Sequence, residues 1–96
     1  MFLHIGGDAV ILLENIVSIL DFNTIRKSKD TRSYLRIAEE EGFTIEISKN
    51  EPKSCIIAEE VRMERKSKTR SVQTVVYYSP ISSTTLQKRV RSLKTL

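Results

Sequence analysis

The residues that could carry acid–base, nucleophilic or metal chemistry are few in this sequence and lie far apart. His4 is the single histidine and alternates with apolar Leu3 and Ile5, which favours a packed or interface histidine over a general base. Cys55 is the single cysteine, has no partner for a disulfide or a metal site, and is expected to fill the core. The three glutamates at 39–41 would spread around a helix end as solvated charge. We therefore expect no catalytic residue, no metal site, no cofactor and no small-molecule substrate.

Positive charge is the chemical feature that the sequence concentrates. The formal net charge of the 96 residues is +4. Residues 1–61 hold seven basic and eleven acidic side chains, a balance of −4, whereas residues 62–96 hold nine basic side chains and the single acid Glu64, a balance of +8. This asymmetry predicts an anionic partner for the C-terminal third, with a solubilising basic tail as the alternative.

Two groups of basic side chains could neutralise the phosphates of double-stranded DNA. One lies in an expected basic loop at 62–71, and the other lies on the C-terminal helix opposite an apolar stripe, with Arg89 beside that stripe. No zinc-finger, basic-zipper or aromatic RNA-binding pattern accompanies them. Composition alone therefore leaves a DNA-binding protein and a protein-interaction module as alternatives. The candidates are Arg65, Lys66, Lys68 and Arg70 in the loop, and Lys88 and Arg91 on the helix.

Apolar and β-branched runs predict the strands that hold these segments in place. Runs at 2–5, 9–13 and 16–20, joined by tight turns that include Gly6 and Gly7, predict an antiparallel N-terminal meander. Further strands are expected at 43–47, 54–61 and 71–78, the last two as a hairpin. The apolar content of the meander exceeds simple alternation, so both faces should be covered, with a neighbouring subunit as the expected cover.

A central helix is expected after the meander. Ser28 or Asp30 would cap it, and Gly42 would end it. Its inward face would carry Thr31, Tyr34, Leu35 and Ala38. Its charges oppose the helix dipole, basic first and acidic last, so either the helix tolerates this cost or its basic end receives an anion, and the first reading is favoured.

A C-terminal helix at about 82–94 completes a predicted α+β fold. Thr84 and Gln87 have the spacing of a capping box at its start. Leu86, Val90 and Leu93 recur at helical spacing and predict one buried stripe.

The composition predicts a single domain over residues 1–96. The sequence is 40% hydrophobic and 29% charged, which is ordinary for a globular protein, and its lone cysteine suits a reducing compartment. No apolar run approaches the roughly 20 residues that span a bilayer, and the start MFLHIGGDAVILL lacks the basic residues of a signal peptide. We expect a cytoplasmic protein without a membrane partner.

Three stretches of the sequence carry a likeness to a known family. FLHIGGDAVILLENIVSILDF, NEPKSCII and VVYYSPISSTTLQKR together resemble the RemA/RemB-like bacterial extracellular matrix regulators, and more closely the RemB branch. The likeness covers roughly residues 1–23, 42–58 and 74–90, and the serine-rich corner YYSPISSTTL is its most specific part. It implies a small non-catalytic regulator of biofilm matrix genes that assembles into a homo-oligomeric ring with DNA along the outside.

The DNA-contacting arginines that the resemblance implies are mostly replaced here. RemA members carry an arginine where this chain has Asn15, and paired arginines where it has Glu51 and Pro52. Lys53 and nearby Lys49 keep positive charge in that loop. We therefore predict a DNA-binding transcriptional regulator that uses Lys49, Lys53 and the basic residues after residue 62. The alternative is a ring-forming interaction module or scaffold that has lost direct DNA binding.

Overall fold

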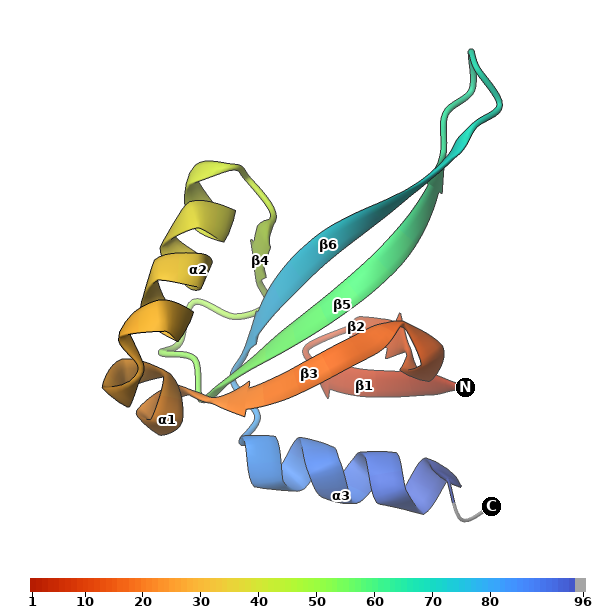
Figure 1. Ribbon diagram of the computed structural model, residues 1–96. Coiled ribbons are helices and arrows are strands. Elements are labelled where there is room, and N and C mark those ends of the chain that lie inside the picture. The colour runs from red at the N-terminus through yellow and green to blue at the C-terminus, as the bar shows by residue number, and fades with distance from the viewer. Residues whose placement is uncertain (95–96) are drawn as a thin grey trace.

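The computed structural model describes residues 1–94, which form an α+β domain with two β-sheets and three α-helices (Figure 1). The α+β class is confirmed. In chain order the elements are β1 (Phe2–Gly6), β2 (Ala9–Leu12), a 3₁₀ turn η1 (Leu13–Asn15), β3 (Ile16–Asp21), α1 (Phe22–Lys27), α2 (Lys29–Glu40), β4 (Thr44–Glu46), β5 (Ser54–Met63), β6 (Arg70–Ser79) and α3 (Ser83–Lys94).

The predicted turn at Gly6 and Gly7 joins β1 to β2 in a two-stranded antiparallel sheet. Both glycines have positive φ, 124° and 53° respectively, which side-chain-bearing residues rarely adopt. His4 is exposed, and its Nε2 lies 2.6 Å from the Gly7 carbonyl oxygen. The packed reading of this histidine is therefore wrong, and the interface reading stays a prediction.

The predicted three-stranded meander is wrong because β3 leaves the first two strands. After η1 the chain joins a second sheet of order β3-β5-β6-β4, in which β3 runs antiparallel to β5. The short β4 pairs in parallel with β6, so this sheet is mixed. The physical reason is that the first half of β5 is buried, so its backbone N–H and C=O groups need hydrogen-bond partners on both sides. The strands β3 and β6 supply these partners.

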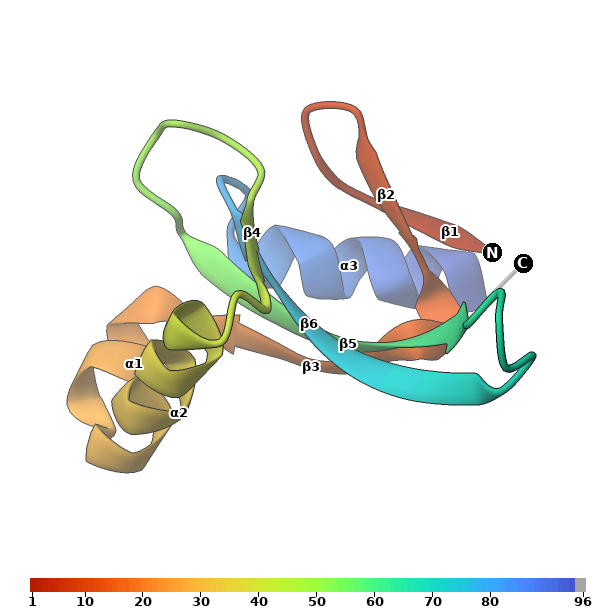
Figure 2. The ribbon, with the colours of Figure 1, turned by 90° about the horizontal axis from the view of Figure 1, so that it is seen from above.

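Both faces of the four-stranded sheet are covered from within the chain (Figure 2). Cys55 and Ile56 are neighbours on β5, and each is 0% exposed, but they belong to two different core clusters. On one face Cys55 packs with Ile25 and Leu35 of α1 and α2. On the other, Ile56 packs with residues of β1, β2 and α3. Within one copy, the predicted cover on both faces is wrong for the β1–β2 hairpin, whose outer face leaves Phe2 and Val10 more than half exposed. The core of the four-stranded sheet is covered by other elements of the same chain.

The central helix follows its predicted ends. The Ser28 hydroxyl accepts the Thr31 backbone N–H at 3.3 Å, and Gly42 has a φ of 78° after the last turn. Leu35 and Ala38 are buried as expected, whereas Tyr34 is 43% exposed and does not face the core. The short helix α1, between β3 and α2, was not predicted.

Serine hydroxyls hold the corner between β6 and α3. Ser79 and Ser54 are fully buried, and their hydroxyls donate to the carbonyls of Ile5 (2.6 Å) and Ile81 (2.7 Å). Ser82 caps α3, because its hydroxyl accepts the Thr85 backbone N–H at 3.2 Å. The predicted capping box at Thr84 is therefore displaced by two residues.

The hairpin of β5 and β6 extends well beyond the rest of the sheet (Figure 1). The last pairing of β3 is at Ala58, while β5 and β6 continue to pair as far as Met63 and Arg70. We call residues 59–74 the arm and residues 64–69 its tip. The expected basic loop at 62–71 is thus shorter than predicted, because its two ends are strands.

Candidate nucleic-acid interface

The arm tip presents the first group of predicted DNA-binding residues to solvent. Arg65, Lys66 and Lys68 lie in the tip, Arg70 begins β6, and all four are exposed. Backbone bonds from Glu64 N–H to the Thr69 carbonyl (3.1 Å) and from Lys68 N–H to the Glu64 carbonyl (2.9 Å) close the turn. The tip is therefore a hydrogen-bonded turn that displays cations.

The acid within the tip, Glu64, forms no ion pair with these cations. The Glu64 carboxylate accepts the Ser67 hydroxyl at 3.2 Å. Within residues 1–94, the ion pairs are those of Glu14 with the N-terminal amine and of Glu51 with Arg26, so the four candidate side chains Arg65, Lys66, Lys68 and Arg70 form no ion pair. They are available to an external anion.

The second predicted group lies on α3. Leu86 is 0% exposed, and Val90 and Leu93 pack against the same core, so the predicted apolar stripe is confirmed. Lys88 and Arg91 are exposed. Arg89 instead donates from its guanidinium to the His4 carbonyl oxygen at 3.1 Å, which ties α3 to β1.

The third group, Lys49 and Lys53, belongs to the connection between β4 and β5. Both side chains are exposed. The Lys53 backbone is fixed, because its N–H donates to the Ser79 carbonyl (2.9 Å) and its carbonyl accepts the Phe22 N–H (3.3 Å). In the same connection the Glu51 carboxylate pairs with the Arg26 guanidinium at 2.9 Å, so these two charges neutralise each other.

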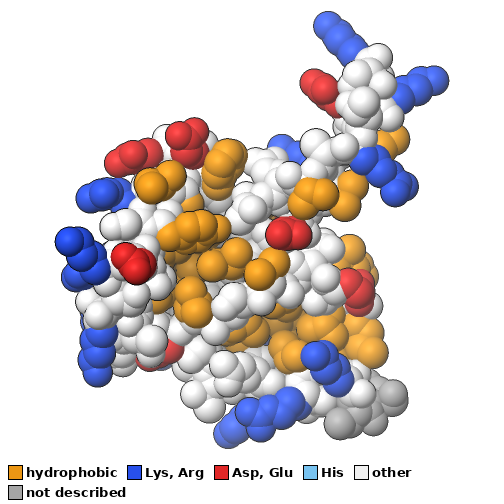
Figure 3. Space-filling model, in the orientation of Figure 1, with side chains coloured by type: hydrophobic (Ala, Val, Ile, Leu, Met, Phe, Trp, Pro, Cys, Tyr) orange, Lys and Arg blue, Asp and Glu red, His pale blue; other side chains and the backbone are white. Residues whose placement is uncertain are grey.

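These three groups do not form one continuous basic surface on a single copy. Lys53 precedes β5 and the tip follows it, and ten strand residues span about 30 Å. Figure 3 shows Lys and Arg side chains at the arm tip, along the helices at the left and on α3, with other surface between them. The structure therefore separates residues that were predicted to act together.

A further basic surface was not among the predicted DNA-binding residues. Lys29, Arg32 and Arg36 recur at i, i+3 and i+7 on α2, and together with Ser33 they line a hollow of about 370 Å³. Arg26 and Lys27 add charge at the end of α1. The signal was present in the sequence as the charges that oppose the helix dipole, and their helical spacing could have assigned them to one face.

The buried titratable groups serve the fold. Burial raises the pKa of the Cys55 thiol to about 12, consistent with an inert core residue. Burial, followed by a hydrogen bond to Glu60, raises the pKa of Tyr77 to about 12. Burial likewise raises the pKa of Tyr78, whose hydroxyl donates to Glu39 at 2.7 Å. Glu39 is therefore not merely solvated charge, because it anchors α2 to β6.

Within residues 1–94, no three His, Cys, Asp or Glu side chains gather as a metal ion would require. In the same part of the chain, no helix is long and apolar enough to cross a membrane.

Comparison with known proteins identifies the family. The model of the RemA-like family, described as extracellular matrix regulatory protein A-like, matches residues 2–90. No curated protein matches the chain. The match is to the family as a whole, so the closer likeness to the RemB branch stays a prediction. Since the match spans both sheets and most of α3, the chain belongs to the RemA-like family of extracellular matrix regulatory proteins.

Proposed function

We propose that this protein is a cytoplasmic, non-catalytic transcriptional regulator of extracellular matrix genes that binds double-stranded DNA as a homo-oligomeric ring. Family membership supports the regulatory role. The observation that carries the DNA proposal is the arm tip, where Arg65, Lys66 and Lys68 are exposed and lack an acidic partner within residues 1–94.

Phosphate contact through the arm would be weak for one copy and strong for many. Each cation that neutralises a phosphate releases a counterion, which favours binding without reading sequence. One tip offers only a few such contacts. A ring repeats the tip, and once one copy is bound the others act at high effective concentration. Lys49, Lys53, Lys88 and Arg91 would add contacts where the path of the DNA meets them.

Two dissimilar apolar surfaces support assembly into a ring. On the outer face of the β1–β2 hairpin, Phe2 is 62% and Val10 is 52% exposed. Beside α2 and β4, Ile37 is 53% and Ile45 is 46% exposed. A closed ring requires a head-to-tail contact between two different patches, rather than one patch that binds itself. We propose that these two patches meet between neighbouring copies.

Charge reversal on the arm tests the DNA proposal. Replacing Arg65 and Lys66 with Glu should lower the affinity for duplex DNA at least tenfold in gel shifts and flatten its dependence on salt, because phosphate contacts set that dependence. The matched control reverses Lys88 and Arg91, which changes the charge equally at exposed sites. We expect that control to lose less than the tip variant. Equal loss in both variants, or wild-type affinity in the tip variant, contradicts contact through the arm.

A second candidate is a ring-forming interaction module without DNA binding. The observation that favours it is the pairing of Glu51 with Arg26, which neutralises part of the loop where family members carry arginines. This alternative predicts a stable ring that gives no gel shift at micromolar protein in low salt. The two functions are thereby distinguished with the unmodified protein.

A further inference from the structure

We propose that the cavity between α1, α2 and the end of β6 binds a small planar aromatic molecule that carries a phosphate or carboxylate group. The cavity has a volume of about 360 Å³, within the range of small-molecule sites. Four separate segments line it: α1, α2, the connection at residues 51–52, and β6. A ligand there would touch all four at once.

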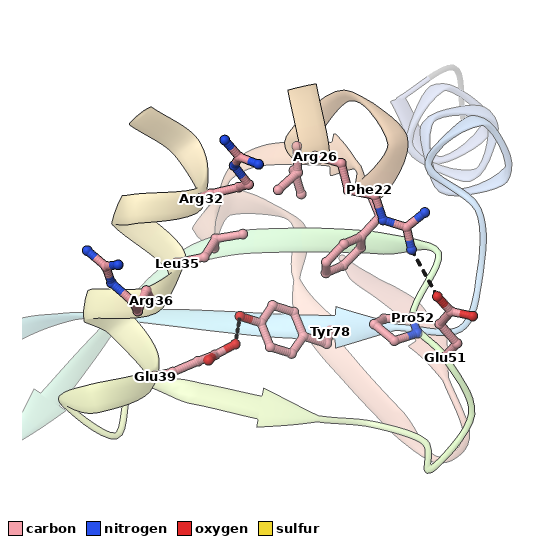
Figure 4. Close-up of a pocket in the computed structure, with 10 residues that line it drawn as sticks. Phe22, Arg26, Arg32, Leu35, Arg36, Glu39, Glu51, Pro52 and Tyr78 are labelled. Carbon is pink, nitrogen blue, oxygen red and sulfur yellow. Dashed lines mark hydrogen bonds and ion pairs between the residues drawn. The ribbon is translucent and has the colours of Figure 1, made fainter. Parts of the chain in front are cut away.

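The floor of the cavity is apolar and partly aromatic. Phe22 and Tyr78 meet edge to face, with ring centroids 5.5 Å apart, and Leu35 and Pro52 complete the floor (Figure 4). Such a surface favours a flat ring, because aromatic groups gain packing area and a defined geometry against other rings. Tyr78 has no free donor for the ligand, since its hydroxyl already donates to Glu39.

The rim of the cavity has a surplus of positive charge. Of its three arginines, Arg26 pairs with Glu51 at 2.9 Å, and the remaining acid, Glu39, accepts the Tyr78 hydroxyl. The guanidinium groups of Arg32 and Arg36 have no hydrogen bond or ion pair within residues 1–94. Glu39 keeps its negative charge, so the rim carries a net charge of +1, and the unpaired guanidinium groups of Arg32 and Arg36 are its donors for an anionic ligand.

The same two arginines also line the basic hollow with Lys29 on the neighbouring side of α2. An apolar cavity and a basic hollow thus share Arg32 and Arg36 as their common border. Figure 4 shows both arginines on α2, with Arg26 and Glu51 on the other side of the aromatic floor. A ring placed on the floor could extend its anionic group across this border, where Arg groups form charge-assisted bonds to phosphate or carboxylate.

The proposal is tested with 1-naphthyl phosphate, 1-naphthoate and uncharged 1-naphthol as probes. Binding to the intact protein is measured by titration calorimetry, with the ring resonances of Phe22 and Tyr78 followed by NMR. We expect both anions to shift these resonances and to bind at least tenfold more tightly than naphthol, because a charge-assisted hydrogen bond is stronger than a neutral one and naphthol offers only a neutral hydroxyl. Preference for phosphate over carboxylate then identifies the class of anion.

Two variants of matched charge locate the anion. Replacing Arg32 and Arg36 with Gln should reduce naphthyl phosphate affinity at least tenfold and leave naphthol binding unchanged. Replacing Arg62 and Lys94 with Gln removes equal charge at exposed positions that do not line the cavity and should leave both affinities unchanged. The inference is overturned if naphthol binds as well as the anions, if both variants lose affinity equally, or if the resonances of Phe22 and Tyr78 do not move. None of these outcomes depends on DNA binding.

Discussion

At the scale of single residues, Gly6 joins the first hairpin to the corner before α3. Its φ of 124° is one that only glycine adopts with ease, and a Cβ at this position would lie 3.0 Å from Pro80 Cδ. Pro80 lies in the rigid corner, so the contact cannot easily relax. The turn at Gly6 therefore packs directly against the corner at Pro80, 74 positions later in the sequence. The hydrogen bond from the Ser79 hydroxyl to the Ile5 carbonyl joins the same two segments.

Gly6→Ala should therefore destabilise the protein by about 1–3 kcal/mol in urea unfolding, from backbone strain and from the contact with Pro80. Gly42→Ala is the matched control, since its φ is also positive, at 78°, but nothing lies within 4 Å of the added Cβ. It should cost about 1 kcal/mol. Equal costs for the two substitutions would show that the corner does not constrain Gly6.

The raised pKa values make a prediction about alkaline pH. Burial raises the pKa of Cys55 from 9.0 to about 12 and, with the bond to Glu60, that of Tyr77 from 10.0 to about 12. The unfolded chain therefore releases these protons first as pH rises, so the free energy of unfolding should fall between pH 9 and pH 12.

Urea midpoints measured from pH 7 to pH 11 test this. Tyr77→Phe removes one of the groups and should make the decline above pH 10 shallower, whereas Tyr34→Phe, at an exposed tyrosine, should leave the decline unchanged. A midpoint that stays constant up to pH 11 would contradict the burial of these groups.

At the scale of elements, α3 depends on a cap that lies outside its predicted capping box. Ser82→Ala should cost about 1 kcal/mol, because the Thr85 N–H loses its acceptor. Thr84→Ala, two residues later on an exposed position, should change stability by about 0.5 kcal/mol or less. The midpoints of thermal unfolding of the two variants test this. A larger loss of stability in Thr84→Ala than in Ser82→Ala would show that Thr84 caps the helix, as the sequence predicted.

The buried hydroxyls of the corner connect the two sheets. Ser79 donates to the Ile5 carbonyl and accepts the Ile81 N–H at 3.0 Å. Ser79→Ala should therefore destabilise by about 1–3 kcal/mol, since two buried backbone groups lose their partner. Ser71→Ala on the exposed arm is the control and should have little effect on the unfolding midpoint. Similar midpoints for both variants would mean that the corner tolerates unpaired groups.

Local signals in the sequence predicted the elements better than their partners. The Ser28 cap, the glycine turn at 6–7 and the Leu86 stripe each depend on residues a few positions apart, and the structure has all three. The pairing of β3 with β5 and the parallel pairing of β4 with β6 depend on chain segments far apart in sequence. Periodicity carries no information on which strand lies beside which, so the meander was wrong.

The candidate site divides in the same way. The run of basic residues at 62–70 predicted a solvent-facing segment, and residues 62–70 are exposed. It could not predict that the arm, α3 and the loop before β5 lie apart, because that follows from the length of the β5–β6 hairpin. The cavity between α1 and α2 could not be predicted from the sequence either, because residues that line it, such as Arg26 and Glu51, are 25 positions apart.

At the scale of the whole molecule, the domain has a well-buried core but also exposes several large apolar side chains on its surface. Its own elements cover both faces of the four-stranded sheet around Cys55 and Ile56, so this part of the core is buried without a partner. Val61 and Val72, which pair across the arm, are 59% and 66% exposed, and Phe2 is 62% exposed. Self-association would remove such surface from water, which is the main favourable contribution to assembly.

The proposed ring predicts that weakening one apolar patch weakens DNA binding. Phe2→Ser with Val10→Ser should lower the mass in solution and, through lost avidity, lower DNA affinity although every basic residue remains. Replacing Arg65 and Lys66 with Glu should do the opposite: the mass of the assembly should stay unchanged, while the affinity for DNA should fall. Analytical ultracentrifugation and gel shifts on both variants separate assembly from contact. DNA binding that persists in a monomeric patch variant would contradict the role of avidity.

The most direct test of the central claim is the mass of the unmodified protein in solution, measured by light scattering with and without duplex DNA. We predict a stable multiple of the 11.0 kDa chain without DNA, and a larger particle with DNA that dissociates as salt is raised. An 11.0 kDa monomer whose mass does not change on adding DNA at low salt would contradict both the ring and the DNA proposal.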